Sequence, residues 1–379
     1  MNQTNKSPLQ QTAPPLYQVN KPYVTASFEI KYHQIIDADG AVVGPIPDFA
    51  RQPEQLIKLY QAMYLTRQFD HKAILLQRRG QLGTYASSLG QEAIGTAIGY
   101  TMQADDVLLP AYREYAAQFL RGVSMTEILL YWGGNEQGMN FQAQKYDFPI
   151  NVPIASQTSH AVGVAYAMQL RQQARVAVCV LGDGATSKGD FYEAINAAGN
   201  WKLPVVFVIN NNHWAISLPR QKQSHAKTLA QKAIAAGISG EQVDGNDVIA
   251  MQFRLDKALN KARNGHGPSV IEALSYRLGD HTTADDATRY RSKDELEQNW
   301  KYEPLSRLHH YLTNMGYWSK HHDQQLEKNT QHLVESAVQK YLNTPAQPPE
   351  SMFDYLYQSL PESLQEQRQS VIERHQGHA

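Results

Sequence analysis

The sequence places oxygen-bearing side chains directly after two neighbouring apolar runs, a pattern that could bind a divalent cation. Asp183 stands between two glycines after the apolar run 176–181. Three asparagines, residues 210–212, follow the second apolar run, 204–209. Carboxylate and amide oxygens are hard ligands that suit Mg²⁺ or Ca²⁺, and Mg²⁺ usually keeps substrate phosphates and waters in its octahedron.

The elements around these residues should bring them together. Residues 176–181 are apolar and short, which indicates a strand buried on both faces, and residues 204–209 form a second run rich in β-branched side chains. Residues 191–201 between them have helical spacing. We expect a β-α-β unit, whose parallel strands end at the same edge of the sheet. Asp183 and Asn212 could then face one ligand.

The glycines beside Asp183 point to a phosphate. Gly182 and Gly184 would let an anion approach the backbone, and the helix that follows presents its amide-rich end to it. The pattern therefore predicts a metal-bridged diphosphate. The alternative is a tight turn in which Asp183 caps the helix and the asparagines merely end a strand. A GDG segment alone would favour that alternative, but GDG followed by an amide run one β-α-β unit later favours the metal-bridged diphosphate.

These residues carry a resemblance to a known family. GDG followed about one β-α-β unit later by a double Asn resembles the thiamine-diphosphate motif. The flanking residues GDFYEAIN, KLPVVFV and AIS resemble the alpha subunit of the decarboxylating component of 2-oxo acid dehydrogenase complexes, the pyruvate and branched-chain group. The resemblance runs from about Leu56 to Gln369 and is strongest to the bacterial pyruvate dehydrogenase type.

The resemblance implies thiamine diphosphate and Mg²⁺ as cofactors. It assigns the metal to Asp183, Asn212 and the backbone carbonyl of Trp214. Alignment on AIS, residues 215–217, makes the last two asparagines the motif pair and leaves Asn210 outside it.

Further cofactor contacts follow from other segments. Tyr112 and Arg113 stand at the start of a predicted helix, where Arg113 could clamp a diphosphate with forked hydrogen bonds. A surface or interface arginine is the alternative, but the family uses a Tyr-Arg pair here. The resemblance also implies that the backbone near Ile154 props the cofactor. It adds the motif residues to the cofactor contacts: Gly182, Asp183, Gly184, Ala185 and Asn212.

Residues 279–291 are too polar for a core segment. They carry one histidine, His281, among acids and arginines, a combination suited to proton transfer. The segment resembles the family's active-site loop, which implies that His281 contacts the cofactor and acts in catalysis. Asp286, Tyr290 and Arg291 fit the loop-stabilising pattern, and we expect them to have structural roles.

The implied activity is thiamine-diphosphate-dependent oxidative decarboxylation of pyruvate with transfer of the acetyl group to a lipoyl-bearing acyltransferase component. A branched-chain 2-oxo acid is the alternative substrate. An alternative of another class is a regulatory module that binds a Mg²⁺-nucleotide. Such a module would want a glycine-rich loop ending in Gly-Lys-Ser/Thr, which the sequence lacks.

The chain shows one α/β module where enzymes of this kind need two. The resemblance implies that a separate beta subunit carries the second module, in an assembly of two alpha and two beta chains with active sites at their interfaces. Expected partners are therefore the beta subunit, the lipoyl-bearing acyltransferase and a small 2-oxo acid.

Composition predicts a globular protein of a reducing compartment. The 379 residues carry a formal net charge of −1, with an isoelectric point near 6.9. This balance favours neither nucleic acid nor membrane as a partner. The one cysteine, Cys179, stands in an apolar run, so no disulfide framework is expected. No basic segment precedes an apolar core near the N-terminus, and we expect a cytoplasmic protein.

We expect an α/β fold of the thiamine-diphosphate-binding type, with a parallel sheet flanked by helices. Residues 1–50 should form an N-terminal arm, mobile up to about Val19, and a hairpin. Residues 51–343 should form the α/β domain, and residues 344–379 a linker with a C-terminal helical tail. Other expected elements are a helix from Pro53, helices at 157–174, 227–236 and 323–341, a strand at 269–276, and a capped turn before a helix at Val248.

Overall fold

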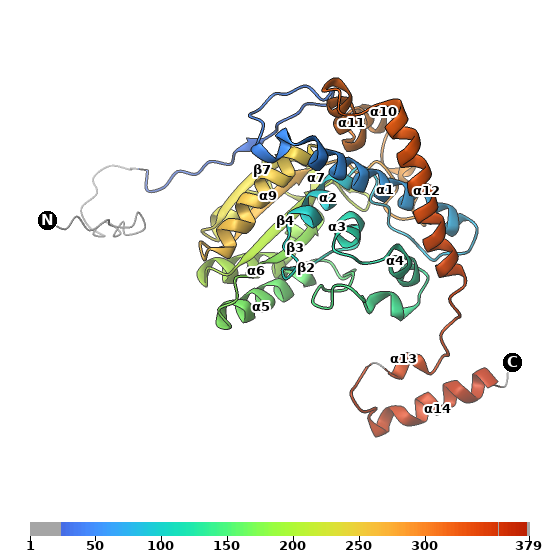
Figure 1. The fold of residues 1–379 in the computed structure, drawn as a ribbon. Coiled ribbons are helices and arrows are strands. Elements are labelled where there is room, and N and C mark those ends of the chain that lie inside the picture. Colours follow the sequence, from blue (N-terminus) through green and yellow to red (C-terminus); the bar gives the residue numbers. More distant parts are fainter. Residues whose placement is uncertain (1–23, 355, 377–379) are drawn as a thin grey trace, which may run out of the picture.

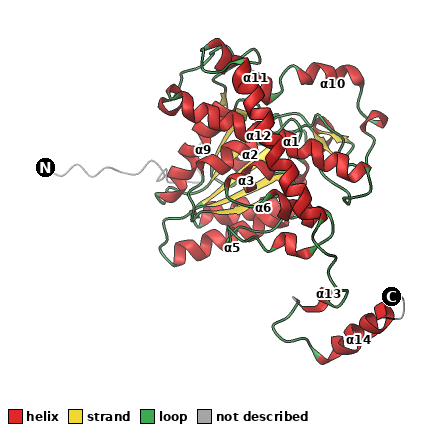
Figure 2. Cartoon of the chain, turned by 45° about the vertical axis from the view of Figure 1, so that its right-hand side comes forward, coloured by secondary structure: helices red, strands yellow, loops and turns green. Residues whose placement is uncertain are grey.

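A six-stranded parallel sheet forms the centre of the chain (Figures 1 and 2). The structure is a computed structural model that describes residues 24–354 and 356–376, so the expected mobile arm lies outside the described residues. In spatial order the strands are β1 (Tyr32–His33), β7 (Ser239–Asp244), β8 (Ser269–Leu274), β4 (Val205–Asn211), β3 (Ala177–Gly182) and β2 (Val107–Leu109). Every pair in this sheet is parallel, which confirms the expected α/β class.

Helices cover both faces of the sheet, as Figure 2 shows. Strand β3 explains why. Val178 and Val180 face one hydrophobic cluster, whereas Cys179 and Leu181 face a second cluster on the other side. The first cluster includes residues of α1 (Pro53–Arg78), α2 (Glu92–Thr101), α9 (Val248–Arg263) and α11 (Pro304–Asn314), and the second includes α5 (Ser156–Leu170) and α6 (Gly189–Asn200).

Eight further α-helices complete the described chain. They are α3 (Tyr115–Leu120), α4 (Met125–Trp132), α7 (Arg220–Gln223), α8 (Lys232–Ala235), α10 (Lys293–Trp300), α12 (Lys320–Leu342), α13 (Ser351–Asp354) and α14 (Glu362–Gln376). Helix α12 packs against α1 and α4, whereas α13 and α14 lie apart from the body in both ribbon views. The domain limits at residues 50 and 343 stay predictions.

In place of the expected N-terminal hairpin, the structure has one antiparallel bridge, between Ile36 and Val42. The carboxylate of Asp247 fixes this segment, because its Oδ2 accepts hydrogen bonds from the backbone N–H groups of Ile35 and Ile36 at 2.6 and 2.8 Å. Its Oδ1 caps α9 by accepting from Ile249 and Ala250. The expected capped turn before a helix is therefore confirmed.

Two expectations need correction. The helix expected over 227–236 is wrong for most of its length, because only α8 forms there. The buried carboxylate of Glu272 instead accepts hydrogen bonds from the N–H groups of Leu229 and Ala230, which directs the chain away from a helix before α8. Strand β4 also continues past residue 209 through Asn211, pairing with the end of β8.

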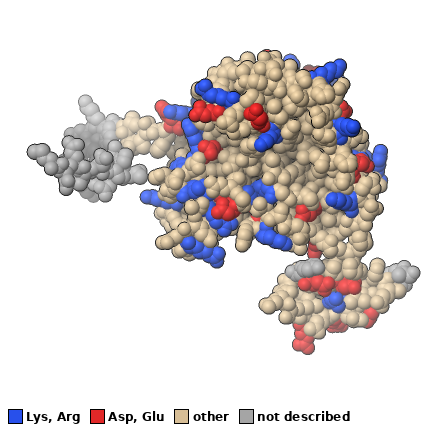
Figure 3. Space-filling view, in the orientation of Figure 1, with Lys and Arg blue, Asp and Glu red and all other residues tan. Residues whose placement is uncertain are grey.

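Charged side chains of both signs are interspersed over the face of the body seen in Figure 3. Within the described residues, the helices are too short or too polar to cross a membrane.

Candidate functional site

A cavity of about 410 Å³ opens at the carboxyl ends of β3 and β4. The chain brings all ten predicted site residues to its lining, although they span 170 positions from first to last. They are Tyr112, Arg113, Ile154, Gly182, Asp183, Gly184, Ala185, Asn212, Trp214 and His281. This convergence is the main geometric result, and the role of each residue toward a ligand stays a prediction.

The carboxylate of Asp183 lacks a cationic partner at hydrogen-bond distance among the described residues. It is 2% exposed, and burial raises the pKa of its carboxyl group above the ordinary value. Its Oδ2 accepts one side-chain hydrogen bond, 2.9 Å long, from the amide of Gln223. Burial removes the water that stabilises an ionised carboxylate. A bound metal ion would replace that stabilisation with its positive charge.

The geometry of the hairpin at Trp214 indicates on which side its backbone carbonyl lies. Strands β5 (Trp214–Ala215) and β6 (Leu218–Pro219) form a tight hairpin, in which the N–H of Arg220 donates to the carbonyl of His213 at 2.8 Å. Trp214 is therefore in the non-hydrogen-bonded position, and its N–H and carbonyl point away from β6. The N–H donates to Oδ1 of Asn212 at 3.2 Å, so the carbonyl lies on the side of Asn212.

Because side chains alternate along a strand, the three asparagines point to two different sides of the sheet. Asn210 and Asn212 line the cavity, whereas Asn211 points to the other side and donates to Glu272 at 2.7 Å. The amide oxygen of Asn210 accepts a hydrogen bond from the Ser275 hydroxyl at 2.8 Å. An oxygen set of Asp183, Asn212 and the Trp214 carbonyl therefore fits the donor chemistry that Mg²⁺ requires.

The two motif glycines have different surroundings. A Cβ on Gly184 would lie 2.7 Å from the Cβ of Ala215, whereas a Cβ on Gly182 would meet no atom within 4 Å and would enter the cavity. Gly184 is thus needed for the close contact between the motif and the β5–β6 hairpin. Gly182 leaves room for a ligand to reach the backbone.

These surroundings predict that alanine at Gly184 lowers stability, whereas alanine at Gly182 weakens cofactor binding. Gly184→Ala should lower the free energy of unfolding by about 1–3 kcal/mol, because it overpacks against Ala215. Gly182→Ala should leave the melting temperature unchanged and weaken thiamine diphosphate binding by about tenfold, about 1.4 kcal/mol. Thermal unfolding and calorimetric titration of both variants would check this. Equal stability of the two variants would contradict the crowding at Gly184.

Arg113 reaches the cavity from the connection between β2 and α3. It is buried, and one of its terminal nitrogens donates to the carbonyl of Ser87. The other nitrogen donates to the His281 carbonyl at 2.5 Å and lies 3.1 Å from Nδ1 of the His281 ring. Arg113 therefore connects the helix α3 region to the polar loop, and its guanidinium stands where an anion in the cavity would meet it.

The imidazole of His281 is neutral at pH 7 in this structure. Its pKa is lowered to about 4, first by burial and then by the positive charges of Arg113 and Arg277. Both arginines lie within 3.4 Å of Nδ1 and can only donate hydrogen bonds, so Nδ1 accepts and the ring proton is on Nε2. His281 can thus offer an N–H from its other nitrogen.

Residues 279–291 form a polar loop that includes the short 3₁₀ helix η4 (Ala287–Arg289). The carboxylate of Asp285 accepts from the backbone N–H of His281 at 2.9 Å and also from the Tyr290 hydroxyl. Asp286 caps η4, and Arg291 donates to the backbone carbonyls of Arg277 and Leu278, directly before the loop. These contacts agree with structural roles for Asp286, Tyr290 and Arg291, and they add Asp285 as the residue that holds His281.

Several residues at the cavity were not expected from the sequence. The additional lining residues include Gln91, Glu114, Asn151, Ser187, Lys188 and Ile216. Backbone strain also gathers here, because Ala155, His213 and Ile216 have positive φ angles of 69°, 69° and 55°. Positive φ at alanine, histidine and isoleucine has no sequence pattern that predicts it.

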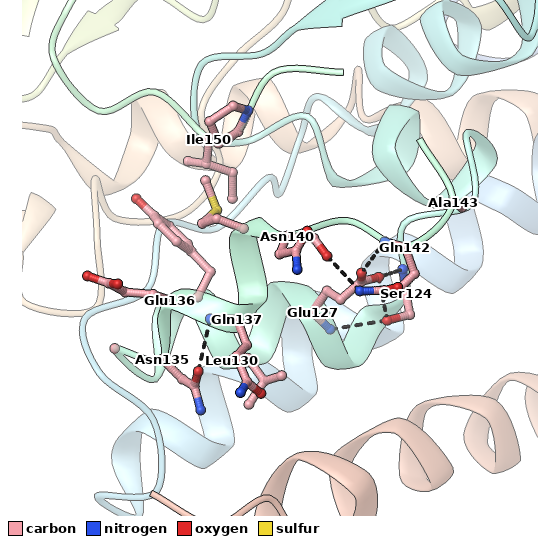
Figure 4. A pocket seen from close by; sticks show the side chains of 15 residues that line it. Ser124, Glu127, Leu130, Asn135, Glu136, Gln137, Asn140, Gln142, Ala143 and Ile150 are labelled. Carbon is pink, nitrogen blue, oxygen red and sulfur yellow. Dashed lines mark hydrogen bonds between the residues drawn. The ribbon is translucent and has the colours of Figure 1, made fainter. Parts of the chain in front are cut away.

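A second, larger hollow of about 1350 Å³ lies beside α4 (Figure 4). Figure 4 shows that the carboxylate of Glu127 is turned to Ser124 and Gln142. Its oxygens accept from Ser124 at 2.7 Å and from the backbone of Gln142 at 2.9 Å, in a helix-capping arrangement. This hollow contains none of the predicted site residues.

Comparison with known proteins agrees with these features. The family described as "Dehydrogenase E1 component" matches residues 60–350. A relative from Mycoplasma genitalium is 39% identical over 338 residues, 89% of this chain and 94% of its own length. Relatives from Staphylococcus aureus and Staphylococcus epidermidis are each 40% identical over 344 residues, 90% of this chain and 92% of their own length. All three bear the name pyruvate dehydrogenase E1 component subunit alpha.

These matches confirm the resemblance inferred from the GDG segment and its flanking residues. With a family match over more than half of the chain and about 40% identity over nine-tenths of it, the chain belongs to the dehydrogenase E1 component family.

Proposed function

We propose that this chain is the alpha subunit of the decarboxylating component of a pyruvate dehydrogenase complex. Its activity is the thiamine-diphosphate-dependent oxidative decarboxylation of pyruvate, with transfer of the acetyl group to a lipoyl-bearing acyltransferase. One observation carries this proposal: the residues that the family motif assigns to cofactor and metal converge on one cavity. The names of relatives about 40% identical over most of the chain support pyruvate as the substrate.

The proposed magnesium ion would be held by Asp183, Asn212 and the carbonyl of Trp214. Bound there, it would neutralise the diphosphate charge, and thiamine diphosphate would supply the electron sink for loss of carbon dioxide. Arg113 would grip the diphosphate, with Tyr112 beside it at 5.1 Å from ring centroid to guanidinium carbon. Ile154, which also lines the cavity, would support the cofactor.

His281 would present its Nε2 proton to the substrate or to the reacting lipoyl group. The loop contacts of Asp285 and Tyr290 would keep the imidazole in place. We assign the diphosphate contacts of the motif to Gly182, which ends β3, and to Gly184 and Ala185, which begin η3 (Gly184–Ser187).

The two other functions have less support. The reported relatives are named for pyruvate, so a branched-chain 2-oxo acid is not favoured. Membership of the dehydrogenase E1 component family also does not favour a Mg²⁺-nucleotide regulatory module.

We further propose a beta subunit as the partner that completes the active site. Large apolar side chains are exposed near the cavity, including Ile154 at 48% and Ile216 at 57%, both in its lining. Val152 and Leu218 are exposed beside them. Apolar surface next to a polar site is typical of an interface with another chain. The cytoplasmic location expected from the sequence stays a prediction.

The test is reconstitution. The purified chain alone should decarboxylate no 2-oxo acid, and co-expression with its beta chain should give turnover of pyruvate that depends on thiamine diphosphate and Mg²⁺. An assay with an artificial electron acceptor measures both preparations, and branched-chain 2-oxo acids serve as the substrate control. Robust decarboxylation by the isolated chain would contradict the need for a second subunit. Preference for a branched-chain acid would overturn the substrate.

A further inference from the structure

Two glutamines outside the predicted site contact its two side-chain metal ligands. We propose that Gln223 and Gln91 are positioning residues for this metal centre, Gln223 as the donor that orients Asp183 and Gln91 as the acceptor that orients Asn212. The inference rests on the proposed function, because it concerns the same Mg²⁺ and diphosphate site. It names residues that neither the motif nor the cofactor contacts include.

Gln223 has a fixed orientation. Its Nε2 donates to Oδ2 of Asp183 at 2.9 Å and to the backbone carbonyl of Leu218 at 3.1 Å. Both partners are pure acceptors, so the nitrogen of the amide must face them. The side chain therefore ties the Asp183 carboxylate to the β5–β6 hairpin, which also supplies the Trp214 carbonyl. This one amide therefore fixes the position of Asp183 relative to the hairpin that carries Trp214, so it relates two of the three proposed metal ligands.

The other end of the same amide argues against a purely structural role. Oε1 of Gln223 is buried without a hydrogen-bond partner among the described residues. A buried acceptor without a donor lowers the stability of the folded protein, and an apolar side chain of similar length would avoid this loss. The hydrogen bond from the Gln223 nitrogen to the Asp183 carboxylate therefore explains why an amide is present at this position.

Gln91 has the complementary role. The N–H of Trp214 donates to Asn212, which identifies the accepting atom of that side chain as Oδ1. The nitrogen, Nδ2, therefore faces Gln91, whose Oε1 accepts from it at 3.3 Å. Gln91 is buried and lines the cavity directly before α2. Its oxygen keeps the Asn212 amide from turning its N–H groups toward a bound cation.

The opposite hydrogen-bonding roles give a sharp test with isosteric glutamate variants. Glutamate can accept a hydrogen bond but has no N–H to donate. Gln91→Glu should therefore keep metal affinity within about threefold of wild type. Gln223→Glu should lose about tenfold or more, because the new carboxylate cannot donate to Asp183 and repels it. Gln91→Met and Gln223→Met should each lose roughly 10–100-fold, the range known for outer contacts of metal ligands.

The measurement uses the complex of this chain with its beta chain and saturating thiamine diphosphate. Mn²⁺ replaces Mg²⁺, because it accepts similar oxygen ligands and its free ion gives an electron paramagnetic resonance signal. Titration yields the dissociation constant without an activity assay. Gln221→Met, on the same short helix and exposed, is the matched control and should bind Mn²⁺ like wild type.

Melting temperatures of the metal-free complexes separate positioning from stability. Gln223→Met should keep its melting temperature within a few degrees, because the loss of two hydrogen bonds is partly offset by removal of the unpaired oxygen. Lower stability with unchanged Mn²⁺ affinity would show a structural role and overturn the inference, as would equal behaviour of the two glutamate variants. A wild-type complex that binds no Mn²⁺ with thiamine diphosphate would overturn the proposed function itself, whereas variants that match wild type overturn the inference alone.

Discussion

Replacing Asp183 with alanine should abolish cofactor-dependent activity and weaken binding of Mg²⁺ with thiamine diphosphate by more than about 100-fold. Outer contacts of metal ligands alone contribute roughly 10–100-fold, and Asp183 is proposed to bind the metal directly. It is also the carboxylate of the proposed ligand set, so its loss removes the negative charge that attracts the cation. The fold should persist, because the substitution removes a buried carboxylate whose pKa is raised by burial.

Calorimetric titration of the complex with thiamine diphosphate in Mg²⁺ would measure this loss, and circular dichroism would check the fold. Asn212→Ala should behave like Asp183→Ala. Asn210→Ala is the matched control and should be much milder, since the amide oxygen of Asn210 is bonded to Ser275. Affinity near wild type in Asp183→Ala would remove this residue from the metal site, and a severe loss in Asn210→Ala would show that the motif pair is shifted.

The same site predicts how binding depends on pH. Metal binding requires the ionised carboxylate, and burial raises the pKa of Asp183. The affinity for Mg²⁺ should therefore decrease as the pH falls through this raised pKa, at a higher pH than an exposed aspartate would give.

The sequence predicted the β-α-β unit well because its signals are local. Apolar runs of strand length with GDG after the first define β3, and the following helical spacing defines α6. The parallel crossover then requires Asp183 and Asn212 to lie at one edge of the sheet. The structure confirms this position, because both residues line the same cavity. The family resemblance added Ile154 and the Trp214 carbonyl and supported the roles inferred for the glycines, Arg113 and His281, and the structure brings these residues to the same cavity.

The sequence could not predict contacts that depend on distant partners. Gln223 is 40 positions from Asp183, and Gln91 is 121 positions from Asn212, so no spacing relates them. Residues 227–231 have helical composition, yet the carboxylate of Glu272 on β8 takes two of their N–H groups. In each case a buried polar group selects its partner in three dimensions, and local propensity is overruled.

The polar loop supports a prediction on catalysis as large as that for Asp183. His281→Ala should lower acyl transfer to lipoyl groups by about 10²–10⁴-fold, the usual contribution of a positioned proton donor. Decarboxylation measured with an artificial electron acceptor should fall less than about tenfold, because only acyl transfer needs a proton at the dithiolane sulfur. Both assays are run on the same preparation of the complex. Thr282→Ala is the control, since among the described residues its hydroxyl accepts a single hydrogen bond, 3.3 Å long, from the N–H of Ala284.

The titration of His281 gives this prediction a physical check. Without ligand its pKa is lowered to about 4 by burial and by Arg113 and Arg277, so the ring is neutral at pH 7 and a poor acid. A diphosphate beside these arginines would offset their charge, and the pKa of His281 should rise when thiamine diphosphate binds. Nuclear magnetic resonance of the imidazole, with His281→Ala to assign its signal, would measure the shift.

The two measurements together decide what His281 does. A raised pKa with selective loss of acyl transfer would make His281 the proton donor of that step, prepared by the cofactor's own charge. Equal losses in both assays would instead assign His281 to substrate or cofactor binding. A pKa that stays near 4 with the diphosphate bound would exclude efficient proton donation at pH 7, and the acid would then have to come from the partner chain.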